Sequence, residues 1–350
     1  MSGTASVPAS RYPQSHRLSG EIRPVIDALA ANRRAYQSFY LDTVEGMSGS
    51  NFSESEDHHQ GLARSHRLRD GSIHFFLTHS EVDPGEQGSL SWYRYAGQTQ
   101  GDHIVTTSPL AVAPMKQLLM LDDRHPSDLT FLPDIDDQDA GYLFVTEEYD
   151  EHRLSVYRWS PEHDLSLQGR ILQGFPSGGP NFVFADRFGE HYYLGIASNH
   201  WGWGMVYRAL DRELFPSKEP GAMDVAAFET ACPGRFFPFP LLDGPSQCKL
   251  VRDAREDWYL LAYRGDPDGD PQGPDYIDAY GVTFHPFRIS GRLFSVHIDL
   301  PPGQTSFTNT GTHWVERSGR LLVSSSYRWA EDEGPGASGY VSRVDECPSP

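Results

Sequence analysis

The chain has 350 residues, 38% of them hydrophobic, and its 29 Lys and Arg against 48 Asp and Glu give a formal net charge of −19. Such an acidic surface repels phosphate backbones and anionic bilayers, so it argues against nucleic-acid and membrane partners. Three cysteines without a Cys-x-x-Cys pair argue against a disulfide framework and a structural zinc site. Because residues 1–17 lack the apolar core of a secretion signal, a cytoplasmic protein is expected.

The N-terminal part divides into a tail and a helix. Residues 1–20 are rich in Ser, Pro and Gly and are expected to form a flexible tail. Pro24 suits a first helical position, and the apolar residues that follow recur at helical spacing, which predicts a helix from Pro24 to Ala35. The region 21–56 would hold this helix and an extended segment at 38–44.

From residue 57 onward, short apolar or alternating runs are separated by Gly, Pro and Asp, as in strands joined by turns. Five similar units follow one another, each with a strand, a polar turn, a strand, a loop and a strand. Their approximate bounds are 57–112, 118–174, 178–240, 244–300 and 308–346. In the first unit the fourth strand is expected at 103–107.

This repetition predicts an all-β, five-bladed β-propeller over 57–346, because radial repetition of four-stranded units removes most sheet edges. A pair of packed β-sheets is the alternative. The fifth unit lacks a fourth strand, and the segment 38–44 would supply it and close the ring. One domain, a monomer or weak dimer, is expected.

The first strand of each blade lines the central channel, so the residues at the starts of these strands should converge. His59 and His125 are the hypothesised proton-transfer pair, with Asp128 as orienter or base, because imidazole titrates near neutral pH and a carboxylate can charge it. The neighbouring polar residues expected to bind substrate are His58, Asn181, Gln247, Asn309 and His313. The alternative is that all these groups only solvate a water-filled channel.

Loops on the same face add aromatic side chains. Trp201 and Trp203 stand among glycines beside His200, and glycine-rich loops lie at the surface, so these rings are expected to be exposed and to contact a ligand. The alternative is that they cap the ends of blades three and four. Other expected members of this rim include Glu147, Glu148, Tyr276 and Trp329.

The same residues allow two metal sites. His59, His125, Asp128 and His313 could bind zinc, iron or manganese. Oxygen ligands from Asp128, Asn181, Asn309 and a Glu of segment 54–56 would suit calcium. Neither set has the spacing of a metal motif, so no cofactor is predicted, and a divalent metal stays open. Motifs for nucleotide cofactors and for a serine nucleophile are absent from the sequence.

Two blade openings, His58-His59-Gln60-Gly61 and His125-Pro126-Ser127-Asp128, resemble those of bacterial β-propeller proteins whose blades open with His-x-x-Gly or His-Pro-x-[Gly/Asp]. A second resemblance is to five-bladed glycoside hydrolases and fructan-acting enzymes, which place carboxylates on the first strands of three successive blades. This chain has Asp57 and Asp128 in the first two blades but Asn181 in the third. Hydrolysis of that type needs a pair of carboxylates, which Asp186 or a loop Glu would have to complete.

The first functional hypothesis is an enzyme of specialised metabolism that acts on a small molecule by acid–base catalysis at the channel mouth, as a lyase, a cyclase or a condensing enzyme. The second is a lectin-like or scaffold propeller that binds a ligand without turnover. The third is a metal-dependent hydrolase or a glycosidase-like propeller.

Overall fold

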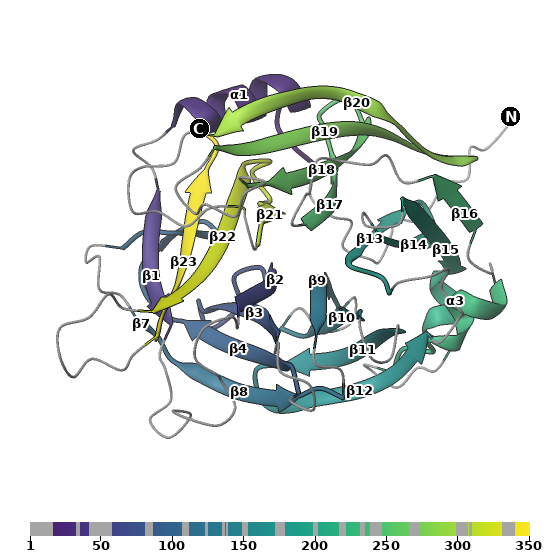
Figure 1. Ribbon diagram of the computed structural model, residues 1–350, viewed down its shortest axis with the longest axis horizontal. Coiled ribbons are helices and arrows are strands. Elements are labelled where there is room, and N and C mark those ends of the chain that lie inside the picture. The colour runs from purple at the N-terminus through teal and green to yellow at the C-terminus, as the bar shows by residue number, and fades with distance from the viewer. Residues whose placement is uncertain are drawn as a thin grey trace, which may run out of the picture.

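The computed structural model describes residues 17–32, 36–41, 58–80, 87–106, 112–122, 125–134, 137, 139–148, 153–171, 179–198, 202–216, 222–231, 235–238, 247–265, 274–298, 307, 310–330 and 340–350. Five antiparallel sheets stand around a common axis, and the first strand of each sheet lies nearest to it (Figure 1). The predicted all-β, five-bladed propeller is confirmed.

The first three blades each have four strands. Blade one contains β2 (His58–Arg64), β3 (Ile73–Ser80), β4 (Ser89–Tyr95) and β8 (Met115–Met120). Blade two contains β9 (Pro126–Pro133), β10 (Gly141–Glu147), β11 (Arg153–Ser160) and β12 (His163–Ile171). Blade three contains β13 (Phe182–Phe188), β14 (His191–Ser198), β15 (Trp203–Leu210) and β16 (Arg235–Pro238). The helices α2 (Asp211–Leu214) and α3 (Ala226–Ala231) precede β16 and were not predicted.

The last two blades complete the ring. Blade four contains β17 (Gln247–Arg252), β18 (Trp258–Arg264), β19 (Asp275–Phe284) and β20 (Phe287–Ile298). Blade five contains β21 (Thr312–Val315), β22 (Leu321–Ala330) and β23 (Tyr340–Pro348), followed by β1 (Gln37–Leu41) and β7 (Val112–Ala113). Strand β1 pairs antiparallel with β23, so the first strand of the chain supplies the outer part of the last blade. Its alternating side chains Phe39 and Leu41 are buried in the core, which fixes this register.

The outer edge of blade one differs from the prediction. Residues 103–107 were expected as its fourth strand, but β6 (His103–Ile104) pairs only with β5 (Thr99–Gln100), and β8 takes the edge beside β4. The short hairpin is held instead by blade five. Its backbone N–H groups at His103 and Ile104 donate to the carboxylates of Glu316 and Glu346, each over 3.1 Å.

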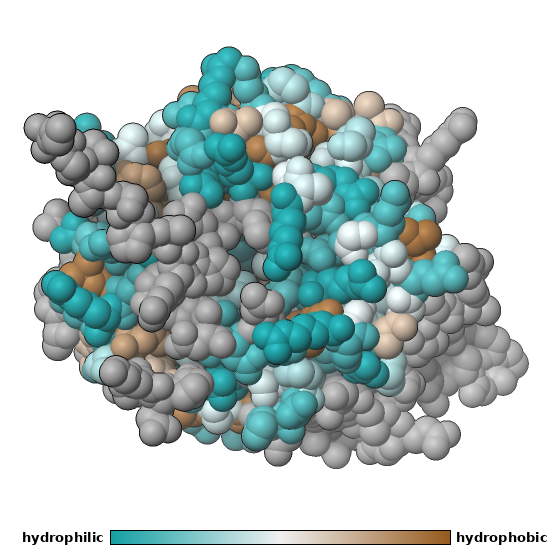
Figure 2. All heavy atoms as spheres, turned by 180° about the vertical axis from the view of Figure 1, so that it is seen from behind, coloured by the Kyte–Doolittle hydropathy of each residue, from teal (hydrophilic) through white to brown (hydrophobic). Residues whose placement is uncertain are grey.

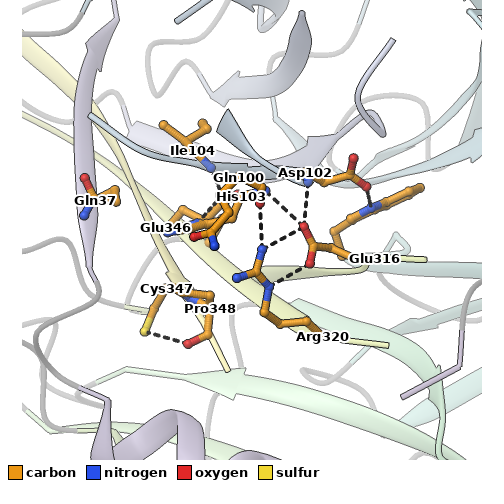
Figure 3. Close-up of polar contacts among 12 residues, drawn as sticks. Gln37, Gln100, Asp102, His103, Ile104, Glu316, Arg320, Glu346, Cys347 and Pro348 are labelled. Carbon is orange, nitrogen blue, oxygen red and sulfur yellow. Dashed lines mark hydrogen bonds and ion pairs between the residues drawn. The ribbon is translucent and has the colours of Figure 1, made fainter. Parts of the chain in front are cut away.

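The seam between blades five and one is a buried polar network (Figure 3). The carboxylate of Glu346 on β23 pairs with the guanidinium of Arg64 on β2, and neither side chain is exposed. The same carboxylate lies 3.1 Å from Nδ1 of His103 and accepts a hydrogen bond of 3.2 Å from the hydroxyl of Ser324. One carboxylate therefore joins the last sheet to the first blade.

Helix α1 (Ile22–Ala31) covers the outer strands of blade four, where Figure 1 shows it beside β20. Ile22, Ile26 and Leu29 recur on one face and are buried against that blade. The helix starts two residues before the predicted position and ends at Ala31, and residues 33–35 lie outside the described part. Leu18, within the predicted tail, is also buried, and its N–H donates to the carbonyl of Arg252.

Hydrophilic side chains cover much of the described surface in Figure 2. Of the helices in the described ranges, none combines the length and the apolar character that a bilayer crossing requires.

Candidate functional site

The starts of the first strands meet across the channel. The side-chain amide of Gln247 in blade four donates to the carbonyl of Gln60 in blade one over 3.2 Å, although blade five stands between these blades. The carbonyl oxygen of the same side chain accepts from the N–H of Gly311 in blade five over 3.1 Å. Three blades are therefore connected at one mouth of the channel, which we call the first-strand mouth.

Two β-bulges lie at this mouth. In blade one, His59 pairs with His79 and Gly61 with Thr78, so Gln60 is the extra residue. In blade two, the register shifts opposite Thr146, so that Ser127 and Asp128 lie on the bulged strand. Bulges re-aim side chains and occur often beside active sites. Here they turn Gln60 and Asp128 toward groups in other blades.

His125 lies between a carboxylate and an amide at this mouth. Its Nδ1 lies 3.3 Å from Oε2 of Glu148, and the hydroxyl of Ser127 donates to the same oxygen over 2.5 Å. Its Nε2 lies 3.3 Å from the side-chain nitrogen of Gln60. Because a carboxylate can only accept, Nδ1 carries the proton of the neutral ring, and Nε2 accepts from the amide. The imidazole is thus held with its basic nitrogen on the side of the channel.

The chain order explains why Glu148 meets His125. Strands β9 and β10 are antiparallel, so the residue before the first lies opposite the residue after the second. The backbone N–H of Glu148 donates to the carbonyl of His125 over 3.2 Å. Gly179 packs directly against the backbone of Glu148. A Cβ at this position would lie 2.1 Å from the carbonyl oxygen of Glu148, so a larger residue would displace it.

His59 belongs to a neighbouring group of polar side chains. It is buried, and its Nδ1 lies 3.2 Å from the hydroxyl of Ser326, which in turn lies 3.0 Å from that of Thr310. The ring of His79 is 6.2 Å away between centroids. His59 and His125 therefore contact different partners. His58 pairs with Ser80 along the strand.

Asp128 does not orient His125, contrary to the prediction. It is fully buried, and both carboxylate oxygens accept from Nζ of Lys249 in blade four, over 2.6 and 2.7 Å. The backbone N–H of Val183 in blade three donates to it over 3.0 Å. Burial raises the pKa of Asp128 to about 6, against the opposing charge of Lys249. This ion pair spans the channel below the mouth and joins blades two, three and four.

The other predicted residues have varied positions. Asn181 is buried at the start of blade three, where its N–H donates to the carbonyl of Ala197. Trp203 was expected to be exposed, but it lies in the core of blades two and three, since β15 begins at that residue. Tyr276 is half-buried under the guanidinium of Arg264, 4.1 Å from the ring centroid. Trp329 belongs to β22, and His200, Trp201 and Asn309 lie outside the described residues.

His313 lies away from the first-strand mouth, between blades four and five. The hydroxyl of Tyr263 donates to its Nδ1 over 2.7 Å, and its Nε2 lies 3.0 Å from the carbonyl of Leu250. Burial lowers the pKa of His313 to about 4. This side chain is therefore a neutral link between two blades and not a member of the predicted group.

This depressed pKa predicts a loss of stability in acid. Below the ordinary imidazole pKa of about 6.5, His313 is protonated in the unfolded chain but stays neutral in the folded chain. The contribution of His313 to the free energy of unfolding is therefore complete above that pH and falls as the pH drops toward 4. The loss is about 3 kcal/mol, since each unit of pKa difference is worth 1.36 kcal/mol. Urea unfolding near pH 7 and near pH 4 should show a smaller acid effect in His313→Gln than in the unaltered protein. Equal acid effects in the two proteins would contradict the assignment.

The predicted metal ligands do not come together. His59, His125, Asp128 and His313 each contact different groups, as given above. Across the described ranges, no group of three or more His, Cys, Asp or Glu side chains is arranged to hold a metal ion. The oxygen set drew on Asn309 and on residues 54–56, which lie outside those ranges.

Two residues of this region were not assigned their roles from sequence. Glu148 was expected on the rim, but not as the partner of His125. The signal was its position directly after the second strand of blade two, opposite the start of the first. Lys249 gave no signal, because a lysine within an alternating strand usually faces solvent.

A scan against models of protein families finds no match, and neither does a search of curated proteins. Among solved structures, a mannose phosphorylase from Leishmania mexicana is 11% identical over 93% of this chain and 92% of its own, with a TM-score of 0.48. A GH43_1 enzyme from Xanthomonas citri is 12% identical over 93% of both chains, with a TM-score of 0.44. A levansucrase from Bacillus subtilis is 11% identical over 91% of this chain and 89% of its own, with a TM-score of 0.45. The fold assignment rests on the strand topology described above.

Proposed function

We propose that the protein is an enzyme that acts on a small polar molecule by acid–base catalysis at the first-strand mouth, with His125 as the proton-transfer group. The observation that carries the proposal is the contact between His125 and Glu148. A carboxylate beside Nδ1 fixes the ring and its tautomer, which leaves Nε2 as the nitrogen that can take up a proton. The reactions that need only such proton transfers include lyase, cyclisation and condensation steps.

The surrounding groups suit a neutral, oxygen-rich substrate. The side-chain amide of Gln60 lies against Nε2 of His125, and a substrate hydroxyl could replace that amide as the hydrogen-bond partner. The freed amide of Gln60 would then donate to an oxygen of the bound molecule. His59 in blade one and Ser326 in blade five contact each other and supply further donors or acceptors. In this scheme Glu148 is a positioning residue for His125.

The test is turnover by the intact protein on a panel of 4-nitrophenyl glycosides, 4-nitrophenyl esters and β-hydroxy carbonyl compounds. We expect His125→Gln to lower kcat/KM for the accepted compound by roughly 10²–10⁴-fold, the usual contribution of a general acid or base. His163→Gln, an exposed histidine on blade two, is the matched control and should keep full activity. Unchanged turnover in His125→Gln would refute the proposal.

Glu148→Gln separates positioning from simple structural support. This substitution should lower kcat while KM stays nearly unchanged, because the ring of His125 loses the charged acceptor that orients it whereas the groups that bind the substrate remain. Glu148→Asp should retain part of the activity. A rise of KM in Glu148→Gln with kcat unchanged would argue against this role.

A binding module without catalysis is the second candidate. The observation in its favour is that Gln247, Thr310 and Ser326 already form hydrogen bonds within the protein, as a rigid recognition surface would. Binding of one of these compounds without turnover, and with an affinity independent of pH between about 5 and 8, would favour this function. The glycosidase-like alternative is disfavoured by the pairing of Asp128 with Lys249, which removes one of the two carboxylates proposed for it.

A further inference from the structure

The opposite mouth of the channel opens into a large cavity that the proposed function does not use. Its volume is about 1350 Å³, and its inner wall consists of the small residues Ala63, Thr130, Ala185 and Thr312, each from the first strand of a different blade. Lys249 also lines it, so the cavity reaches the ion pair that spans the channel. The turns 65–72 and 316–320 of blades one and five form the rim.

The carboxylates that line this cavity already have partners. All six Asp and Glu side chains of the lining accept hydrogen bonds or ion pairs from other groups: Asp70, Asp102, Asp134, Asp139, Asp186 and Glu316. Figure 3 shows Glu316 facing Arg320 and the backbone of Asp102. Four of these carboxylates pair with an arginine, namely those of Asp70, Asp134, Asp139 and Glu316. Asp102 accepts from the indole N–H of Trp314, and Asp186 accepts from the backbone N–H of Arg187.

Two guanidinium groups on the rim, unlike the other cations that line the cavity, form no ion pair with a described carboxylate. Arg64, Arg69, Arg320 and Lys249 each pair with a carboxylate. Arg67 donates only to the neutral carbonyl of Gly71, over 3.4 Å, and Arg317 is exposed on the equivalent turn of blade five. Among the residues placed by the structure, no carboxylate forms an ion pair with either of them. Two guanidinium groups without an ion-pair partner among the described carboxylates therefore lie at one cavity, where they are available to an anion.

An aromatic surface lies beside these cations. The rings of His66 and Trp314 are stacked, with centroids 6.2 Å apart and an interplanar angle of 26°. The indole N–H of Trp314 donates to the carboxylate of Asp102 over 2.9 Å, which holds the ring in place. Both residues line the cavity and are only half-buried, so a flat ligand could pack against them.

We propose that this cavity is a second ligand site, distinct from the first-strand mouth, and that it binds a planar organic anion, with Arg67 and Arg317 on its phosphate or carboxylate group and Trp314 against its ring. Guanidinium groups recognise both kinds of anion through paired N–H donors. The proposal is independent of the proposed function, because the ion pair of Lys249 and Asp128 lies between the two mouths.

The test is isothermal titration calorimetry of the intact protein with 2-naphthyl phosphate, 2-naphthoate and neutral 2-naphthol at low salt. We expect at least one anion to bind roughly tenfold or more tighter than 2-naphthol, and its binding to weaken as salt is added. Which anion binds tighter distinguishes a phosphate site from a carboxylate site. Equal binding of all three compounds, or no binding of either anion, would overturn the proposal.

Variants locate the site. The double variant Arg67→Gln/Arg317→Gln should lose roughly tenfold or more of the affinity for the preferred anion, the usual effect of losing charge-assisted hydrogen bonds. Arg317→Gln alone should lose part of it and serves if the double variant is poorly folded. Arg288→Gln, an exposed arginine on β20, is the matched control, and His125→Gln should bind the anion normally. Unchanged affinity in both Arg67→Gln/Arg317→Gln and Arg317→Gln would place the anion elsewhere.

Discussion

Lys249→Met should destabilise the protein by about 3–5 kcal/mol, the usual cost of removing one partner from a buried ion pair. The variant leaves the Asp128 carboxylate fully buried, with only the N–H groups of Val183 and Leu129 as donors. A buried carboxylate without its counter-ion must either stay charged in a low-dielectric channel or take up a proton. Urea unfolding followed by circular dichroism measures the loss.

A second substitution identifies the cause. In Lys249→Met/Asp128→Asn the charge is gone, and the amide oxygen can still accept from Val183. This double variant should recover most of the lost stability, since replacing both partners of a buried pair is often nearly neutral. If the single variant is as stable as the unaltered protein, the ion pair does not hold blades two, three and four together.

Glu346→Ala should cost a similar amount, about 3–5 kcal/mol, because it leaves the Arg64 guanidinium buried without its carboxylate. It also removes the acceptor for the N–H of Ile104 and for Ser324. Thermal and urea unfolding should show the loss. Glu346→Gln keeps an acceptor of the same shape and should be less destabilised than the alanine variant. Equal effects of the two substitutions would mean that the negative charge opposite Arg64 accounts for the whole loss, and that neither the side-chain volume nor the remaining acceptor contributes.

The carboxylate of Glu346 also makes the stability of the seam between blades five and one depend on pH. The charge of Arg64 and the hydrogen bond with His103 hold the pKa of Glu346 below its usual value, although burial opposes them. For a carboxyl group with a lowered pKa, the stabilisation is present above the unfolded value near 4.5 and is lost as the pH falls through the folded value. The difference in stability between the unaltered protein and Glu346→Gln should therefore shrink in acid.

The blade arrangement could be predicted because each blade repeats the same local signals. The polar turns, such as Arg69-Asp70-Gly71 and Arg317-Ser318-Gly319, mark the link between first and second strands, and strand order follows from them. The outer strands carry weaker signals, since their partners depend on the neighbouring blade. Residues 103–107 were expected to form an outer strand. Instead, the backbone N–H groups of His103 and Ile104 donate to Glu316 and Glu346, which are more than 200 residues away in sequence.

The candidate site shows a second limit of sequence reasoning. The spacing His125-Pro126-Ser127-Asp128 places both polar groups at one strand start, and His125 is indeed at the mouth. Strict alternation cannot anticipate the bulge at Ser127 and Asp128, which directs the carboxylate to Lys249 in another blade. Glu148 takes its place beside His125. In the same way, glycines around Trp203 suggested an exposed loop, while the strand that begins there buries the ring.

The pairing of β1 with β23 has a consequence for biosynthesis. Gln37 aligns with Glu346, so the ribosome must add about 300 residues after the first strand before its partner exists. At about 5–20 residues per second, this takes roughly 15–60 s. During that interval four blades can form behind the nascent chain, but the inner edge of β1, which pairs with β23, has no partner. Premature termination before residue 340 would therefore leave an open arc of blades with two unsealed ends, and not merely a propeller that is one strand short.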